Sequence, residues 1–254
     1  MEPYVPPWIE STTIVVSLLI AVVIGVGFVR RAQSLPSPRP ATRTWSRIGP
    51  VVVALWLLAA FILGNQGFFR PTPPNRFPTI ILGFIPLVAG YALLLLSRSF
   101  RAIVTATPLA WLIGVQFFRT FGLVFVILYA GGNLPGVFAL PAGIGDGLVG
   151  ITAPIVAYLL LTQHSGARPA AVLWNIAGIV DLAVAMTMGF LSSPGPLQLL
   201  AHDAPNVLVT AFPLVLVPTF AVPLFLLLHL FSLHELRNRA LGNRIQTGSR
   251  PAHV

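Results

Sequence analysis

Seven long apolar runs constrain this chain most, because each is long enough to cross a lipid bilayer as a helix. Apolar residues make up 56% of the 254 positions and charged residues only 8%, against roughly 25% charged in a soluble domain. The runs are continuous rather than alternating, which argues against an outer-membrane β-barrel. The sequence therefore predicts an all-α, polytopic integral membrane protein, a seven-transmembrane-helix bundle. The expected spans are residues 9–29, 48–69, 77–96, 109–129, 140–161, 170–191 and 207–231.

The arginines are distributed unequally between the connections. With the N-terminus outside, twelve fall on the inner side and only Arg70 and Arg76 on the outer side. This bias predicts an outer N-terminus and a cytoplasmic C-terminus. We expect an outer tail over residues 1–8, a membrane domain over 9–233 and a basic cytoplasmic tail over 234–254. The inner arginines are Arg30, Arg31, Arg39, Arg43, Arg47, Arg98, Arg101, Arg168, Arg237, Arg239, Arg244 and Arg250.

The net charge of +9 is explained by this orientation, so we expect no nucleic-acid partner. The expected partners are the lipid bilayer and anionic lipid head groups at its inner face. Compactness and the lack of cysteine favour a bacterial cytoplasmic membrane. Seven spans with an outer N-terminus resemble rhodopsins and receptors in topology alone. Every basic residue is arginine, which excludes a lysine-linked retinal.

Arg119 and Asp181 are the charged residues expected near the middle of apolar spans. A charge at that depth is costly and usually has a partner or a function. Gln116 shares the helix face of Arg119, and Trp174 shares that of Asp181. We predict that Arg119 and Asp181 face one another and bind an ion, a proton or an anionic group. A purely structural ion pair is the alternative.

Two further polar residues, Asn175 and Asp146, belong to the candidate site or its surroundings. Asn175 faces about 120° away from Asp181, so we expect it to bond a different neighbour. Asp146 lies among Gly143, Gly147 and Gly150, a pattern of close helix packing, and we expect it to cap a helix at the outer interface. A glycine-lined substrate mouth is the bolder interpretation of Asp146.

The seventh run is rich in proline. Pro213, Pro218 and Pro223 remove backbone donors and free carbonyls, among them that of Thr219. Such a carbonyl needs another partner in lipid. This pattern predicts a hinge beside a hydrated cavity or, alternatively, a bent helix that packs well.

His164 and His229 both fall near predicted inner span ends and could ligate a metal or haem b axially. Interfacial anchoring is the simpler explanation, so we predict no metal and no cofactor. The sequence contains no GxSxG nucleophile elbow of the kind found in hydrolases. We therefore favour a protein that is not an enzyme. The leading hypothesis is an intramembrane site that binds or conducts a small ligand, ion or proton. A non-enzymatic assembly subunit and a haem-binding redox protein are the alternatives.

Overall fold

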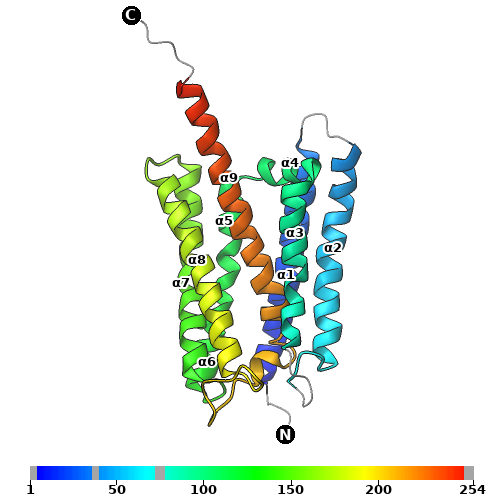
Figure 1. The fold of residues 1–254 in the computed structure, drawn as a ribbon, viewed down its shortest axis with the longest axis vertical. Helices are drawn as coiled ribbons and strands as arrows, with labels where there is room; N and C mark the ends of the chain where they lie inside the picture. Colours follow the sequence, from blue (N-terminus) through cyan, green and yellow to red (C-terminus); the bar gives the residue numbers. More distant parts are fainter. Residues whose placement is uncertain (1–4, 36–39, 72–77, 249–254) are drawn as a thin grey trace, which may run out of the picture.

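The computed structural model describes residues 5–35, 40–71 and 78–248, and every regular element among them is helical. Arg39, Arg76 and Arg250 lie outside these residues, as does half of the predicted N-terminal tail. The helices stand side by side in one elongated bundle (Figure 1). In chain order they are α1 (Pro7–Gln33), α2 (Pro40–Asn65), η1 (Thr79–Phe84), α3 (Ile85–Leu96), α4 (Arg98–Ala106), α5 (Leu109–Gly114), η2 (Val115–Gly122), α6 (Leu123–Ala130), α7 (Gly136–Leu161), α8 (Ala167–Ser192), η3 (Leu208–Thr210), η4 (Val217–Ala221) and α9 (Val222–Gly248).

Seven helical segments within the described ranges are long and apolar enough to cross a membrane, which agrees with the predicted number. Their outer surfaces carry large apolar side chains: Leu173 is 70% exposed and Val88 67%. A soluble protein rarely exposes so much apolar surface. The segments are Pro7–Gln33, Pro40–Asn65, Thr79–Leu96, Leu109–Ala130, Gly136–Leu161, Ala167–Ser192 and Val217–Asn238.

One end of the bundle carries the end of α1, the start of α2, α4, the α7–α8 turn and the C-terminal part of α9 (Figure 1). Arg30 and Arg31 are in the last turn of α1, Arg98 and Arg101 in α4, and Arg168 near the start of α8. The basic residues of these elements therefore gather at one end of the molecule. The N-terminus lies at the opposite end (Figure 1).

Four boundaries differ clearly from the sequence prediction. The α2 helix begins at Pro40 rather than at residue 48, and the α7 helix begins at Gly136 rather than at residue 140. This glycine-rich segment is helical, so its backbone hydrogen bonds are formed within the segment. Conversely, residues 207–216 contain only the short helix η3 and turns, because the prolines interrupt the last span before η4. The α9 helix then continues to Gly248, past the predicted start of the tail.

Two departures from α-helical geometry lie inside spans. The middle of the fourth span is the 3₁₀-helix η2, and η4 is a π-helix that contains Pro218. Such local changes of winding often mark functional positions. The 3₁₀-helix places Gln116 and Arg119 in register on one face, because residues three apart eclipse each other in that geometry.

Candidate intramembrane charge site

Arg119 lies at the centre of the site and is only 2% exposed. Its Nε donates to Asp146 Oδ1 at 2.7 Å, and its Nη2 forms an ion pair with Asp181 Oδ2. Its Nη1 donates to the Gly178 carbonyl at 3.3 Å and lies 3.0 Å from His229 Nε2. One guanidinium thus joins η2 to α7, α8 and α9.

The predicted outer cap at Asp146 is wrong. The early start of α7 places Asp146 in the helix interior, roughly 15 Å along the axis from Gly136. The residue is buried and its carboxylate contacts Arg119 instead of a helix N-terminus. The sequence pattern of glycines predicted the close packing around it but not the charge partner.

Glycines bring the backbones close enough for these contacts. A Cβ at Gly145 would lie 1.6 Å from Asp181 Oδ1, and a Cβ at Gly122 would lie 2.3 Å from the Asp146 Cβ. At Gly150 a Cβ would meet the Thr120 nitrogen at 2.4 Å. These values are far below any van der Waals contact, so α7 can approach η2 and α8 this closely only because glycine is present. The predicted close packing of the α7 glycines is confirmed.

A hydrogen-bond chain leads from Arg119 along α9. A guanidinium can only donate, so His229 Nε2 accepts, and the imidazole is neutral with its hydrogen on Nδ1. That Nδ1 donates to Asn175 Oδ1 at 2.9 Å. The Asn175 Nδ2 donates to Ser232 Oγ at 2.9 Å and to the Ala171 carbonyl at 2.7 Å. As predicted, Asn175 bonds neighbours other than Asp181, and it joins the network through His229.

Trp174 packs against the imidazole ring of His229. Its ring centroid lies 5.1 Å from that of His229, and its Nε1 donates to Thr152 Oγ1 at 3.0 Å. On the other side, a Cβ at Gly178 would lie 2.4 Å from His229 Nε2. The imidazole is therefore held between an aromatic ring and a glycine backbone.

Gln116 lies one 3₁₀ turn from Arg119 and is 0% exposed. Neither atom of its side-chain amide has a hydrogen-bond partner among the described residues. An unpaired buried polar group costs about 1–3 kcal/mol. The amide is therefore available to a ligand at the centre of the bundle.

Thr219 is outside this network. Its Oγ1 donates to the Val215 carbonyl at 2.6 Å, and its own carbonyl accepts from Trp56 Nε1 at 2.9 Å. The carbonyl freed by Pro223 thus has another partner, as predicted. A Cβ at Gly83 would lie 2.6 Å from the Thr219 Cα, so η1 also packs tightly on η4.

The two histidines of the haem hypothesis have different surroundings. His164 is exposed in the α7–α8 turn, where its Nδ1 accepts from the Gly166 amide. His229 is fully buried, and both of its ring nitrogens are engaged by Arg119 and Asn175. A histidine whose nitrogens are both occupied cannot ligate iron in this conformation. In the part of the chain that the structure describes, no cluster of three potential metal ligands occurs.

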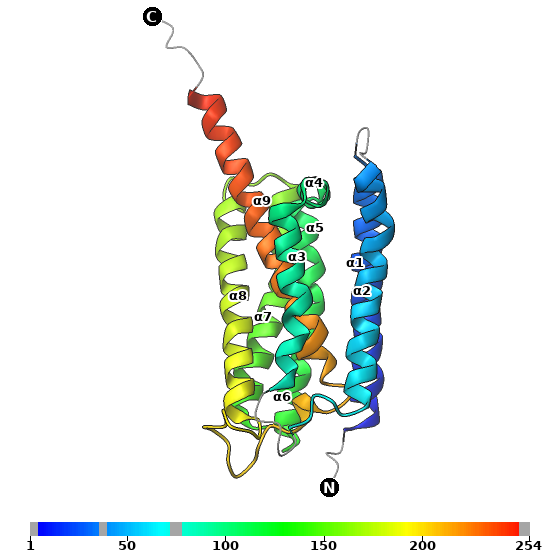
Figure 2. The same ribbon diagram turned by 45° about the vertical axis from the view of Figure 1, so that its right-hand side comes forward.

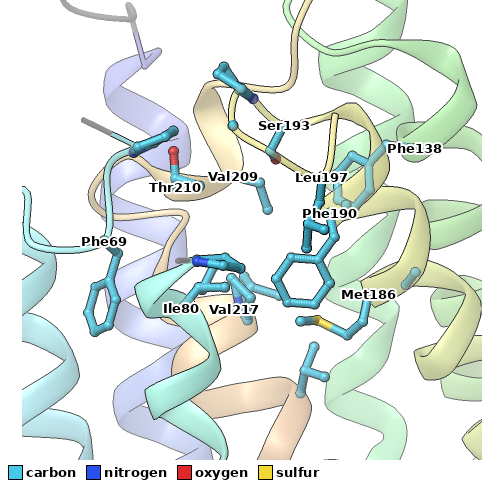
Figure 3. A pocket seen from close by; sticks show the side chains of 18 of the residues that line it. Phe69, Ile80, Phe138, Met186, Phe190, Ser193, Leu197, Val209, Thr210 and Val217 are labelled. Atoms are coloured by element: carbon cyan, nitrogen blue, oxygen red, sulfur yellow. The ribbon is translucent and has the colours of Figure 1, made fainter. Parts of the chain in front are cut away.

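A cavity of ≈ 80 Å³ reaches Asp146 from the end of the bundle opposite the C-terminus. Figure 3 shows its apolar wall side chains converging beneath the connection between α8 and η3. The α2–η1 connection also contributes, through Phe69 and Arg70. Asp146 is therefore the contact between this cavity and the Arg119 network.

The formal charges of the site do not balance. Arg119 carries one positive charge, whereas ionised Asp146 and Asp181 carry two negative charges and His229 none. An uncompensated charge in a medium of low polarity costs several kcal/mol even after relaxation. A site with this composition can reach neutrality by taking up one proton or one monovalent cation.

Residues 77–237, more than half of the chain, match the model of a family described as a domain of unknown function (DUF8737). No curated protein and no solved structure matches the chain. All residues of the Arg119 network lie within the matched segment. The chain therefore belongs to the DUF8737 family.

Proposed function

We propose that this chain spans the membrane seven times, with its N-terminus outside, and that its Arg119 site holds one exchangeable proton. The gain or loss of that proton accompanies the binding or conduction of a small ligand or ion. The seven apolar helices and their exposed apolar side chains support membrane insertion. The arginines gathered at the C-terminal end support the orientation.

The main support for the proposal is that the site has two aspartates and only one arginine. A pair made of one arginine and one aspartate would be neutral and would need nothing further. Asp146 and Asp181 on one guanidinium leave a negative charge, which a proton on either carboxyl removes. Loss of this proton would leave two carboxylates competing for Arg119, so protonation is linked to the packing of η2 against α7 and α8.

The surroundings offer a route on either side of the site. The cavity gives access to Asp146 from the N-terminal end of the bundle. His229, Asn175 and Ser232 extend the hydrogen bonds toward the C-terminal end. The buried Gln116 amide supplies a further polar contact next to Arg119. Arg119 and Asn175 do not release protons, so this chain orients the site and extends its polar contacts, while the exchangeable proton is held on a carboxyl group.

Infrared spectroscopy of the purified protein tests the proposal. A protonated carboxyl gives a carbonyl band that shifts in D₂O and is absent for a carboxylate. We expect one such band at neutral pH, and either Asp146→Asn or Asp181→Asn alone removes it, because the remaining aspartate then balances Arg119. Asp203→Asn, in an exposed connection, is the matched control and leaves the band. Absence of the band in the natural protein, or its survival in both single variants, contradicts a stored proton.

A structural role in an assembly is the second candidate. It is favoured by the dense glycine packing and by the number of helices that one guanidinium joins. In that case the network only fixes helix positions, and the carboxyl protonation state does not respond to pH in the folded protein. Following the same infrared carboxyl band across a series of pH values therefore separates the two candidates.

A further inference from the structure

The cavity next to Asp146 combines an apolar wall with one carboxylate. Its wall includes the rings of Phe69, Phe125, Phe138 and Phe190 and the thioether of Met186. Figure 3 shows Phe69, Phe138, Phe190 and Met186 around the same space, with Ser193 and Thr210 near the connection above it. Mostly apolar walls with a few placed polar groups are typical of small-molecule sites.

The carboxylate in this wall has a free acceptor. Asp146 Oδ1 accepts from Arg119, whereas no hydrogen bond from a described residue reaches Oδ2. The Asp146 side chain lines the cavity and is only 9% exposed; a Cβ at Gly122 would lie 2.7 Å from Oδ2, so this oxygen also lies against η2. The other charged groups at the cavity or its carboxylate are Arg119, which holds Oδ1, and Arg70 in the same wall as Phe69.

These features select a cation with an apolar body. With both carboxyls ionised, the Asp146–Asp181–Arg119 group carries one excess negative charge, which favours a cation over an anion at Asp146, while Arg70 adds a positive charge at the wall near Phe69. Aromatic faces bind organic cations through their quadrupoles, and the remaining wall favours hydrocarbon. An inorganic ion would satisfy the carboxylate but would leave the apolar wall without a contact.

The volume limits the size of the ligand. Benzene, with six heavy atoms, binds in an engineered cavity of roughly 150 Å³. A cavity of ≈ 80 Å³ therefore suits about three heavy atoms, or the head of a slightly longer ligand.

We propose that this cavity binds a small organic ammonium, with its nitrogen at the Asp146 carboxylate and its hydrocarbon against the phenylalanine rings. This inference rests on the proposed function in one respect, the release of the stored proton when the ammonium binds. The incoming ammonium supplies the positive charge that the stored proton otherwise supplies. The carboxyl O–H bond then breaks, one proton leaves to water, and the charge of the site is unchanged.

Propylammonium is the probe, with 1-propanol as the neutral match and propionate as the anionic match. Ligand-observed NMR on the purified full chain in detergent measures binding at millimolar concentrations, because four heavy atoms limit affinity to about tens of micromolar at best. We expect propylammonium to bind at least about tenfold more tightly than propanol, and propionate not to bind. Equal binding of propanol and propylammonium would overturn the proposal.

Two variants separate the site from general effects. Asp146→Asn removes the ionisable group and should abolish the preference for propylammonium. Gly189→Leu fills the cavity and retains every charge, and a Cβ at Gly189 meets Phe138 only at an ordinary 3.6 Å. Ala183→Leu, which adds a leucine on an exposed face of the same helix, is the matched control and should bind as the natural protein does. Undiminished binding to a folded Gly189→Leu variant would refute the cavity as the site.

Proton release distinguishes this proposal from the proposed function. In weak buffer, one proton per bound propylammonium is expected at neutral pH. Asp146-dependent binding without proton release retains the ammonium site and contradicts the stored proton. A protonated carboxyl by infrared, together with no propylammonium binding, gives the opposite result: the stored proton remains and the ammonium site is wrong.

Discussion

The α1–α2 hairpin and the rest of the bundle are stabilised in different ways. The two hairpin helices pack against each other along one side of the molecule (Figure 2), and their outer residues are apolar, such as Val22 at 59% and Leu55 at 57% exposure. The Arg119 network lies entirely in η2, α7, α8 and α9. Apart from the hydrogen bond from Trp56 to the Thr219 carbonyl, apolar contacts position the hairpin, whereas buried hydrogen bonds and charges specify the arrangement of the other helices. The family match begins after the hairpin, at residue 77.

Replacing Arg119 should give the largest effect and the sharpest contrast between the two regions. Arg119→Leu leaves Asp146 and Asp181 unpaired, and loss of one partner from a buried ion pair costs about 3–5 kcal/mol. Ser17→Ala, a buried polar change in the hairpin, should cost less than about 1 kcal/mol. The free energy of unfolding in mixed micelles measures both. Similar losses for the two variants would remove the contrast.

The two aspartates should be strongly non-additive. Asp146→Asn or Asp181→Asn alone leaves a neutral pair with Arg119, so each should destabilise the protein by no more than about 1–2 kcal/mol. The double variant leaves the guanidinium without a counter-ion and should lose about 3–5 kcal/mol beyond the sum of the singles. The same unfolding assay gives the coupling. Simple additivity would mean that the two carboxylates do not share one arginine.

His229→Phe tests the link from the charges to α9. The phenyl ring can still pack on Trp174, but Arg119 Nη1 and Asn175 Oδ1 lose their shared partner. Two buried polar groups left unpaired should cost about 2–4 kcal/mol. His164→Phe, in the exposed turn, should change unfolding by less than about 0.5 kcal/mol. If the two histidine variants behave alike, the buried hydrogen-bond chain through His229 contributes nothing to stability.

The smallest effects should come from adding one methyl group in each region. Gly145→Ala forces a Cβ onto Oδ1 of Asp181, whose other carboxylate oxygen, Oδ2, is held by Arg119, so we expect a loss of about 1–3 kcal/mol. Gly25→Ala in α1 meets the Pro50 Cβ at 3.4 Å, an ordinary contact, and should gain up to about 1 kcal/mol from helix propensity. Thermal unfolding should therefore show a lower midpoint temperature for Gly145→Ala and an unchanged or higher one for Gly25→Ala. A stabilising Gly145→Ala would show that the carboxylate is free to move.

Sequence reasoning located the parts of this site that break an apolar pattern. Arg119 and Asp181 stand out because charges are rare in such runs, and the spans follow from length and hydropathy. Asp146 was misplaced because glycines usually indicate a loop, whereas here they form a helix that needs close approach. His229 was assigned to a span end because the last span was expected to begin at residue 207. The prolines delay the helix, which places His229 in the middle of the span Val217–Asn238.

Solid-state NMR on the chain in lipid, labelled with ¹⁵N-arginine and ¹³C-aspartate, tests the central claim most directly. The account predicts one guanidinium with dipolar couplings to two aspartate carboxyl carbons, one with the chemical shift of a protonated acid and one of a carboxylate. Asp146→Asn should remove one of these couplings and leave the other carboxyl ionised. Coupling of the guanidinium to a single carboxyl, or two carboxylates that both remain ionised at neutral pH, would contradict it.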